Sequence, residues 1–291
     1  MQFVLAKIVY SFLILISLLP FRLLYVLSDV VYFLLYRVIG YRKKVVRANI
    51  KIAFPEYTTS QIIAIEKEFY KHFCDMFLEM IKTLSISKED LLKRYTFSNI
   101  KLLKEYEAKG KSIVLMMSHY ANWEWSMALN HYLSFQGYGI YRPLQNGHFD
   151  KIVRNIRSRF DTELISAYSL AREMRNHDRK GTKGVYLFIN DQTPMLRKNQ
   201  YWQDFFGINV PVFDGAEHIA INLDMTVLFL KVKKVKRGYY SAEFIEITDQ
   251  ACDTSDHFIT RKFIQLVENQ IKEEPKFYFW THKRWKHQGK K

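Results

Sequence analysis

Five consecutive apolar residues at positions 113–117 constrain the fold of this chain more than any other segment. The run lies between Gly110 and Ser118, and a short apolar run bounded in this way is typical of a buried strand. A helix is expected to start directly afterwards, at residues 123–129. The segment therefore predicts a strand–turn–helix unit whose turn is both exposed and rigidly held.

This turn carries a histidine and a carboxylate five positions apart, His119 and Glu124. On a regular helix that spacing places two side chains on different faces. The two residues can meet if His119 lies on the turn and Glu124 lies one turn into the helix. Glu124 would then bond one ring nitrogen and leave the other as a base. A surface or capping pair is the simpler explanation when the two residues are considered alone.

The remaining apolar segments alternate between helical and extended patterns. Apolar residues recur at helical spacing from Ser60 to Leu84. Strands are expected near residues 139–141 and at four later segments: 163–166, 185–190, 226–231 and 240–247. This alternation predicts an α/β fold with a central mixed sheet flanked by helices.

Two polar residues follow predicted strands. Arg142 is expected to project from a strand end, where a guanidinium is suited to hold a phosphate or a developing oxyanion. Asp191 lies at the carboxyl end of another strand, the edge at which ligands gather in open α/β sheets. It is suited to bind a sugar hydroxyl, although an aspartate before Thr193-Pro194 is equally typical of a turn. An ordinary surface arginine is the alternative for Arg142.

The first 40 residues differ in composition from the rest of the chain. Their two apolar segments, 8–21 and 23–36, are each too short for an unstrained membrane span of about 20 residues. We expect a helical hairpin or tilted anchor rather than a signal peptide, because no small-x-small cleavage pattern follows. The basic cluster Arg42-Lys43-Lys44 predicts that this side stays cytoplasmic. The predicted division is an N-terminal hydrophobic helical membrane anchor at residues 1–40 and one larger domain at residues 41–291.

A formal net charge of +15 predicts an anionic partner. A membrane surface fits better than nucleic acid, because aromatic residues make up 16% of the chain and no nucleic-acid motif is present. The mean hydropathy of −0.19 excludes a polytopic transporter. Cys74 and Cys252 are too few for a disulfide framework, and no histidine has metal-ligand spacing, so we expect no metal.

Six short motifs occur in a fixed order between Lys43 and Lys286. They are Arg47-Ala48-Asn49-Ile50 with Ala53-Phe54-Pro55-Glu56, Ser118-His119 through Glu124, Tyr141-Arg142-Pro143-Leu144, Asp191-Gln192-Thr193-Pro194, Phe205-Phe206-Gly207, and Trp280-Thr281-His282-Lys283-Arg284-Trp285. Together they resemble the late acyltransferases of lipid A biosynthesis, the bacterial lauroyl/myristoyl transferase family. Asp161 departs from the pattern, because the resemblance leads us to expect glycine after Arg157-Ser158-Arg159-Phe160.

The resemblance implies a function and a set of site residues. His119 and Glu124 occupy the two positions of the family's His-x4-Asp/Glu acyltransferase motif, which implies His119 as general base and Glu124 as the residue that fixes its tautomer. Arg142, Arg159 and Asp191 are the implied substrate-binding residues. For Arg159, a solvated face of a basic helix is the alternative. The basic end of the chain, from His282 to His287, is expected to be solvated.

The implied reaction moves a fatty acyl chain from a thioester to a hydroxyl of a lipid A precursor at the cytoplasmic face of the inner membrane. The implied donor is acyl carrier protein, sometimes coenzyme A, and no other cofactor is expected. Both donors are anionic, which suits the net charge of +15. Acylation of another lipid, such as a lysophospholipid, an amino-acid lipid or a pigment, is the first alternative. A non-catalytic basic membrane-binding protein is the second, and the intact His119/Glu124 pair argues against it.

Overall fold

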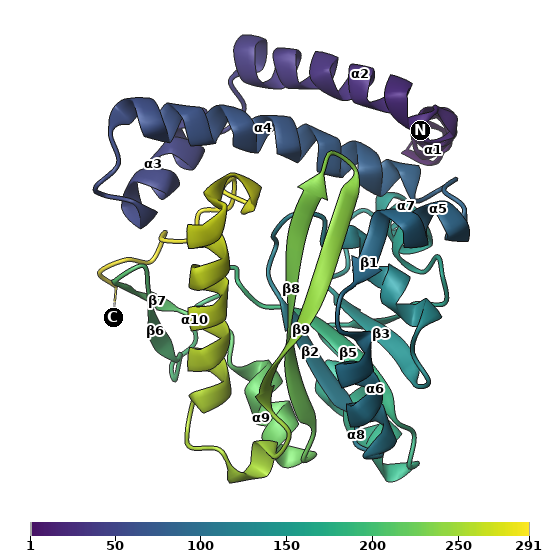
Figure 1. Cartoon of the computed structure of the whole chain (residues 1–291), viewed down its shortest axis with the longest axis vertical. Helices are drawn as coiled ribbons and strands as arrows, with labels where there is room; N and C mark the ends of the chain where they lie inside the picture. The colour runs from purple at the N-terminus through teal and green to yellow at the C-terminus, as the bar shows by residue number, and fades with distance from the viewer. Residues whose placement is uncertain (1, 291) are drawn as a thin grey trace.

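The computed structural model describes residues 2–290, which are built around a seven-stranded sheet (Figure 1). The strand order is β1-β9-β8-β2-β5-β3-β4, and every neighbouring pair is parallel except β8 and β9. The strands are β1 (Tyr95–Phe97), β2 (Ile113–Met117), β3 (Gln136–Tyr141), β4 (Glu163–Ser166), β5 (Gly184–Ile189), β8 (Thr226–Lys236) and β9 (Tyr239–Thr248). The predicted α/β fold with a central mixed sheet is confirmed.

The predicted central strand is confirmed as β2, whose five residues are all buried. It lies between β5 and β8, so helices and loops cover both of its faces and an unbroken apolar sequence is required. Its pairing with β5 runs in register from Ile113 opposite Val185 to Met117 opposite Ile189. This register decides which residues meet at the carboxyl edge of the sheet.

Eight α-helices between residues 43 and 273 precede, separate and follow the strands of the sheet. They are α3 (Lys43–Ala53), α4 (Thr59–Lys82), α5 (Lys88–Arg94), α6 (Ile100–Ala108), α7 (Gly147–Arg157), α8 (Leu170–Arg179), α9 (Gly215–Asn222) and α10 (Phe258–Glu273). The longest, α4, starts with a capping box in which Thr58 and Gln61 satisfy each other's backbone. It crosses the end of the sheet at which β8 finishes (Figure 1). Since β2 and β5 run parallel to β8, α4 covers the edge where their carboxyl ends lie.

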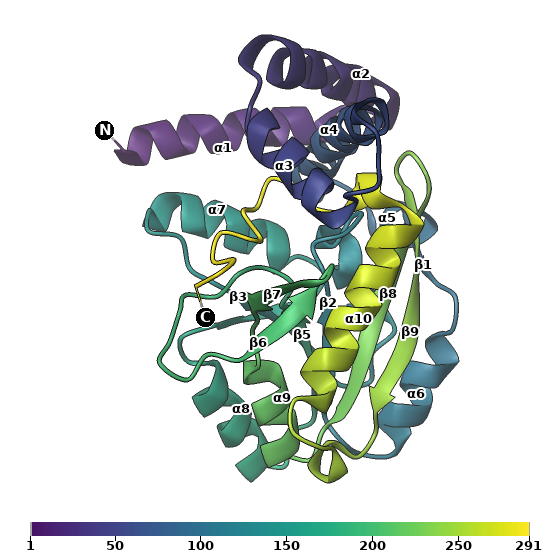
Figure 2. The ribbon, with the colours of Figure 1, turned by 90° about the vertical axis from the view of Figure 1, so that its left-hand side faces the viewer.

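The N-terminal segment forms α1 (Gln2–Leu18) and α2 (Phe21–Tyr32), and α2 continues into a π-helical turn, Phe33–Ile39. Helix α2 lies along α4, whereas α1 projects from the body of the molecule (Figures 1 and 2). Large apolar side chains are exposed along the whole segment: Leu5, Ile8, Phe12, Leu15, Leu18, Leu23, Val26, Val30, Phe33, Leu34, Val38 and Ile39.

Among residues 2–290, no helix taken by itself is long and apolar enough to cross a bilayer. Only the bent pair Phe21–Ile39 and Lys43–Ala53, at 93°, reaches that length and composition together. The anchor and the domain boundary near residue 40 stay predictions.

Two strands outside the main sheet were not predicted. Strands β6 (Trp202–Phe205) and β7 (Ile208–Pro211) form an antiparallel hairpin. Its two turn residues, Phe206 and Gly207, have φ values of 53° and 69°, as a tight two-residue hairpin turn requires. The Phe205-Phe206-Gly207 motif therefore has a backbone role, and its Phe205 is also buried in the core.

The departure at Asp161 has a backbone explanation. Asp161 has φ 61° and the preceding Phe160 has φ 65°, so both lie in the left-handed region. Glycine adopts this region without a steric penalty, whereas a residue with a Cβ is strained there. The local backbone thus has the conformation for which glycine is suited, and this chain places an aspartate in it.

Several sequence motifs that are far apart in the chain pack against one another. The side-chain amide of Asn49 donates to the carbonyl oxygens of Trp280 and His282, each at 2.7 Å. Phe54 contacts the rings of Phe206 and Trp280, with centroids 5.5 and 6.3 Å apart. The amino-terminal and carboxyl-terminal motifs are therefore parts of one packed unit.

The expectation of a solvated basic end is wrong for Arg284, which is only 1% exposed. One guanidinium nitrogen donates to the carbonyl oxygen of Pro211 at 3.1 Å, and the group lies over the ring of Phe205 at 5.0 Å. The carbonyl oxygen of Arg284 accepts from the Thr193 hydroxyl at 2.7 Å. Lys283 and Lys286 are exposed, whereas Arg284 is buried because its part of the chain packs against the loop that follows β5, a long-range contact that local composition does not encode.

Candidate active site

The pairing of β2 with β5 brings the two motif loops together. Met117 lies opposite Ile189 at the ends of these parallel strands. His119 and Asp191 each come two residues later, so they leave the sheet side by side at its carboxyl edge. The sequence predicted both residues to be at strand ends but did not predict that they would meet.

His119 and Asp191 form a close polar pair in this site. One carboxylate oxygen of Asp191, Oδ1, lies 2.6 Å from Nδ1 of His119 and also accepts from the His119 backbone N–H at 3.1 Å. A carboxylate only accepts, so the partner assigns the proton of a neutral His119 ring to Nδ1 and leaves Nε2 as the basic nitrogen. The His119 side chain keeps 20% of its surface exposed, whereas that of Asp191 keeps 1%.

Asp191 is held in its charged form. Burial raises the pKa of this carboxyl group. The nearby His119 and its hydrogen bonds lower the pKa by more than burial raises it, so the pKa lies below its usual range. A permanently ionised Asp191 is able to orient the imidazole and to stabilise an imidazolium. The predicted role of Asp191 in binding a substrate hydroxyl is untested, and the structure adds a contact with His119.

The expectation that Glu124 hydrogen-bonds a ring nitrogen of His119 is wrong. Both carboxylate oxygens of Glu124 are bound elsewhere: Nε of Arg157 donates to Oε2 at 2.9 Å, and Nη2 of Arg157 donates to Oε1. The cause is the backbone, because Glu124 is the first residue of a 3-10 helix, Glu124–His131, and does not lie one turn into an α-helix. Ala121, at φ 52°, turns the chain between the two motif residues.

Glu124 reaches His119 through an aromatic side chain. The indole N–H of Trp123 donates to Oε1 of Glu124 at 3.1 Å, and the Trp123 ring meets the His119 ring edge-on with centroids 5.1 Å apart. Phe279 packs against both rings, at 5.3 Å from Trp123 and 5.8 Å from His119. Glu124 thus helps to fix the Trp123 side chain that packs against the His119 ring.

The arginines fall into two groups. Arg157, the last residue of α7, was not predicted as a site residue and is the one that contacts the motif. Arg142 is exposed, and its Nε donates to the Tyr168 hydroxyl at 3.1 Å. Arg159 donates to the carbonyl oxygen of Thr83 and lies over the ring of Phe160. The substrate contacts predicted for Arg142 and Arg159 stay predictions.

An apolar cavity that is partly open to solvent adjoins this group, and both Glu124 and Arg157 line it. Most of its wall comes from the sheet and from the 3-10 helix: Leu115, Met127, Leu129, Leu133, Ile140, Leu164, Val185, Leu187 and Ile189. Two glycines of β3, Gly137 and Gly139, also line it. A Cβ on Gly137 would come within 2.0 Å of Oδ1 of Asn130, a residue of the same wall. A cavity with this apolar lining is suited to a hydrocarbon chain.

Within residues 2–290, no group of three or more His, Cys, Asp or Glu side chains is placed to hold a metal ion. The imidazole of His119 and the carboxylate of Asp191 lie beside the apolar cavity at this edge of the sheet. This combination is suited to activating a hydroxyl next to a bound apolar chain.

Residues 2–287 match the profile of the family described as bacterial lipid A biosynthesis acyltransferase. This chain belongs to that family. It is similar to a curated lipid A biosynthesis acyltransferase of Haemophilus influenzae, at 23% identity over 274 residues that cover 92% of this chain and 83% of the relative. The resemblance carried by the six motifs is confirmed, and the chain is an acyltransferase.

An apolar cavity beside an imidazole is compatible with acyl transfer, the activity of this family. Trp123 lies between the cavity and His119, since it lines the cavity and contacts the histidine ring. A surface or capping pair, the simpler explanation of His119 and Glu124, does not account for that cavity.

Proposed function

We propose that this acyltransferase transfers a fatty acyl chain from a thioester to a hydroxyl of a lipid A precursor, with His119 as general base. The observation that carries the proposal is the His119–Asp191 pair, 2.6 Å apart, beside an apolar cavity at the carboxyl edge of the sheet. The acceptor follows from the family and from the name of the Haemophilus relative.

In the proposed reaction, Nε2 of His119 removes the proton of the acceptor hydroxyl as its oxygen attacks the thioester carbonyl carbon. The carbonyl π electrons move to oxygen and give a tetrahedral oxyanion. When this collapses, the carbon–sulfur bond breaks and the departing thiolate takes the proton back from His119. The imidazolium that exists between the two steps is stabilised by Asp191. No covalent intermediate on the enzyme is required.

Glu124 and Arg157 are proposed to position this chemistry rather than to take part in it. Their ion pair lies at the wall of the cavity and fixes Trp123, which contacts the His119 ring. Burial raises the pKa of Glu124, but the charge and hydrogen bonds of Arg157 lower it more, so Glu124 is ionised at neutral pH. Arg142 and Arg159 are kept as proposed contacts to the phosphates of the acceptor.

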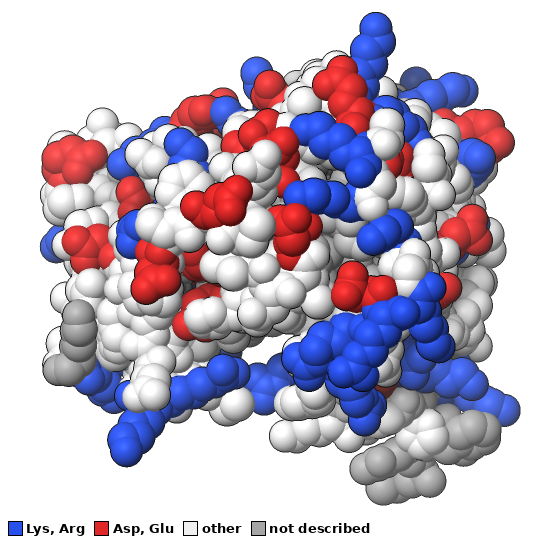
Figure 3. Space-filling model, turned by 90° about the horizontal axis from the view of Figure 1, so that it is seen from below, with Lys and Arg blue, Asp and Glu red and all other residues white. Residues whose placement is uncertain are grey.

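Acyl carrier protein is the proposed donor, with coenzyme A as the alternative. Lys and Arg gather along one side of the molecule in Figure 3, which is the side that carries α1, α7 and α8 in Figure 2. Exposed cations on that side include Arg142, Lys151, Arg154, Arg172, Arg175 and Arg179. A donor that binds through such charges is expected to lose affinity as salt is added.

We further propose that α1, α2 and the exposed face of α3 rest on the cytoplasmic surface of the inner membrane. Residues 1–51 hold eight Lys or Arg and one Asp, together with most of the exposed large apolar side chains. Apolar side chains flanked by cations are typical of helices that lie in a membrane interface. Replacing Phe12 and Leu15 by glutamate should lower binding to vesicles of anionic phospholipid by about tenfold or more, at unchanged folding.

Transfer of a radiolabelled acyl chain from acyl carrier protein to purified lipid A precursor tests the proposed function. We expect wild-type protein to acylate this acceptor and His119→Ala to retain less than about a tenth of the rate. Lysophospholipid serves as the competing acceptor. Preferential acylation of lysophospholipid would overturn the proposed substrate, and a fully active His119→Ala variant would overturn the proposed base.

A further inference from the structure

Helix α4 buries an unusual set of polar side chains in addition to its apolar ones. His72, Asp75, Glu79 and Lys82 recur at helical spacing, and each is less than a tenth exposed. Burying charged groups costs free energy unless they are paired and hydrogen-bonded. These residues take no part in the proposed proton transfers, so their partners show what they do.

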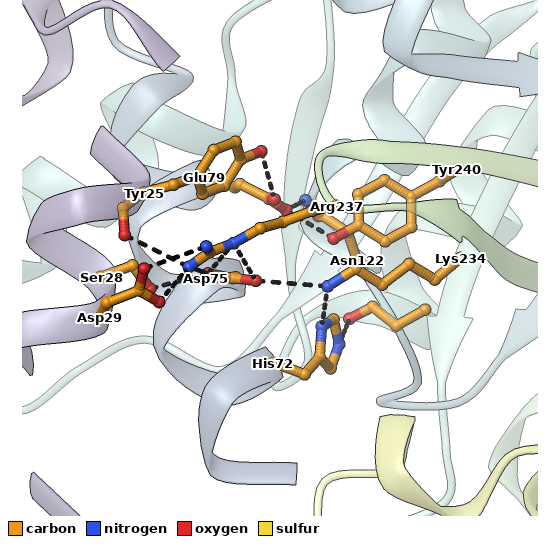
Figure 4. Close-up of polar contacts among 11 residues, drawn as sticks. Tyr25, Ser28, Asp29, His72, Asp75, Glu79, Asn122, Lys234, Arg237 and Tyr240 are labelled. Atoms are coloured by element: carbon orange, nitrogen blue, oxygen red, sulfur yellow. Dashed lines mark hydrogen bonds and ion pairs between the residues drawn. The ribbon is translucent and has the colours of Figure 1, made fainter. Parts of the chain in front are cut away.

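Glu79 accepts hydrogen bonds from three different parts of the chain (Figure 4). The Tyr25 hydroxyl of α2 donates to Oε1 at 2.9 Å. The Tyr240 hydroxyl of β9 and the side-chain amide of Asn122 both donate to Oε2 at 2.7 Å. Three donors around one buried carboxylate fix its position and, through it, the position of Asn122 in the motif turn.

His72 connects a lysine to the same turn (Figure 4). Nζ of Lys234 lies 3.1 Å from Nδ1, and the carbonyl oxygen of Ala121 lies 3.1 Å from Nε2. An ammonium group only donates and a carbonyl only accepts, so His72 accepts at Nδ1 and donates from Nε2. Burial and the nearby Lys234 hold the pKa of His72 well below its ordinary value, which keeps this neutral tautomer at pH 7.

Ala121 and Asn122, which bind His72 and Glu79 of α4, lie between His119 and Glu124. Ala121 is fully buried in a left-handed conformation that costs a residue with a Cβ about 1–2 kcal/mol. The Ala121 N–H donates to the Phe277 carbonyl oxygen at 2.9 Å, so both the N–H and the carbonyl oxygen of Ala121 are hydrogen-bonded. Asn122 uses its other side-chain atom, Oδ1, to accept from the Trp125 N–H at 3.0 Å and so caps the 3-10 helix.

Helix α2 is joined to the same cluster by charge. Asp75 binds Nη2 of Arg237 at 2.7 Å and the Ser28 hydroxyl at 2.8 Å. Arg237, in the turn between β8 and β9, also binds Asp29 of α2 at 2.6 Å. The N-terminal segment is therefore attached to α4 at Asp75 and Glu79, in the same cluster that contacts the motif turn (Figure 4).

We propose that His72 and Glu79 are positioning residues that hold the turn from His119 to Glu124 in its reactive geometry, and that Tyr25 of α2 completes this support. A left-handed residue in a turn persists only when surrounding contacts fix it. The His72 and Asn122 hydrogen bonds supply those contacts from α4. The proposal rests on the proposed function, because it assigns a role in the same acyl transfer.

The first test compares two replacements of His72. Nε2 of His72→Gln can still donate to the Ala121 carbonyl oxygen, whereas His72→Phe keeps a ring without a donor. We expect His72→Phe to lower kcat by about tenfold or more with little change in KM for either substrate, and His72→Gln to recover most of that loss. Equal loss in the two variants would overturn the positioning role, because it would reflect removal of the ring alone.

The second test compares two tyrosines of α2. Tyr25→Phe removes one donor to Glu79, and Tyr32→Phe removes a hydroxyl from a ring that stacks on Tyr36 outside the cluster. We expect Tyr25→Phe to lower kcat several-fold at unchanged acyl-carrier-protein KM, and Tyr32→Phe to behave as wild type. Wild-type kcat in Tyr25→Phe would overturn the role of α2.

Thermal unfolding of each variant separates positioning from loss of fold, since kcat is compared per folded molecule. The wild-type enzyme is the common reference. If wild-type protein transfers no acyl chain to lipid A precursor, the proposed function fails. If wild-type protein is active and His72→Phe has the same kcat, only the positioning role fails.

Discussion

Oδ1 of Asp191 binds both the ring Nδ1 and the backbone N–H of His119, at 2.6 and 3.1 Å. One buried carboxylate oxygen therefore fixes the ring and the main chain of the same residue. The family motif names Glu124 as the carboxylate partner of the histidine, yet Glu124 binds Arg157 and Trp123. In the structure Asp191 contacts the His119 ring directly, whereas Glu124 binds the tryptophan that packs against that ring.

Asp191→Asn should lower kcat by about 10²–10⁴-fold, because an amide does not stabilise an imidazolium and can hold the wrong ring tautomer. The measurement is acyl transfer at saturating donor and acceptor. Asp191→Ala, with its thermal unfolding recorded, controls for loss of the buried contact. A kcat within threefold of wild type in a folded Asp191→Asn protein would show that Asp191 does not orient the base.

Arg157→Ala should lower the free energy of unfolding by about 2–3 kcal/mol, because it leaves the buried carboxylate of Glu124 without its charge partner. Glu124→Gln in the same protein should remove much of that cost. A double-mutant cycle by urea unfolding measures the coupling, which we expect to exceed about 1 kcal/mol. Additive effects of the two substitutions would contradict a direct energetic link.

Leu164→Trp should shift donor preference toward shorter acyl chains, because Leu164 lines the apolar cavity and tryptophan fills part of it. The measurement is kcat/KM for a series of acyl carrier proteins that differ only in chain length. Leu164→Met, which keeps the volume, is the matched control. An unchanged order of preference in a folded Leu164→Trp protein would place the acyl chain elsewhere.

Stability should fall as pH drops from 6.5 toward 4, in part because of His282. Nε2 of His282 accepts from the Thr193 N–H at 3.0 Å, and burial lowers the pKa of His282 to about 4 in the folded state. The unfolded chain, in which an ordinary histidine has a pKa of about 6.5, binds more protons in this window, so acid favours unfolding. Thermal unfolding of His282→Gln should depend less on pH between 6.5 and 4. An identical pH dependence in the two proteins would refute this assignment.

Asp161→Gly should raise the free energy of unfolding by about 0.5–1 kcal/mol. Asp161 is exposed and has φ 61°, a conformation in which glycine relieves strain but also gains entropy in the unfolded chain. Asp161→Ala keeps the Cβ and should give no gain. Chemical unfolding of the three proteins measures the difference, and a destabilised Asp161→Gly variant would mean that the aspartate side chain makes a stabilising contact.

Patterns local in the chain were enough to predict much of this fold. The apolar run of β2 follows from a short segment, since a strand buried on both faces requires continuous apolar sequence. The bounds of the edge strand β4 were also predicted. The helical spacing of α4 was also visible. The sequence predicted no role for its buried His72, Asp75 and Glu79, because helical spacing does not show which distant residues each side chain contacts.

Patterns along the chain were enough to predict a central mixed sheet, the position of His119 on a turn after a buried strand, and the family to which the six motifs belong. They did not predict which carboxylate contacts that histidine, because this depends on long-range contacts. The register of β2 against β5 places Asp191 beside His119, although the two lie 72 positions apart. Glu124, five positions away, is directed to Arg157 by the 3-10 geometry of its helix. Strand register and backbone turns depend on contacts between distant segments, and closeness in sequence does not encode them.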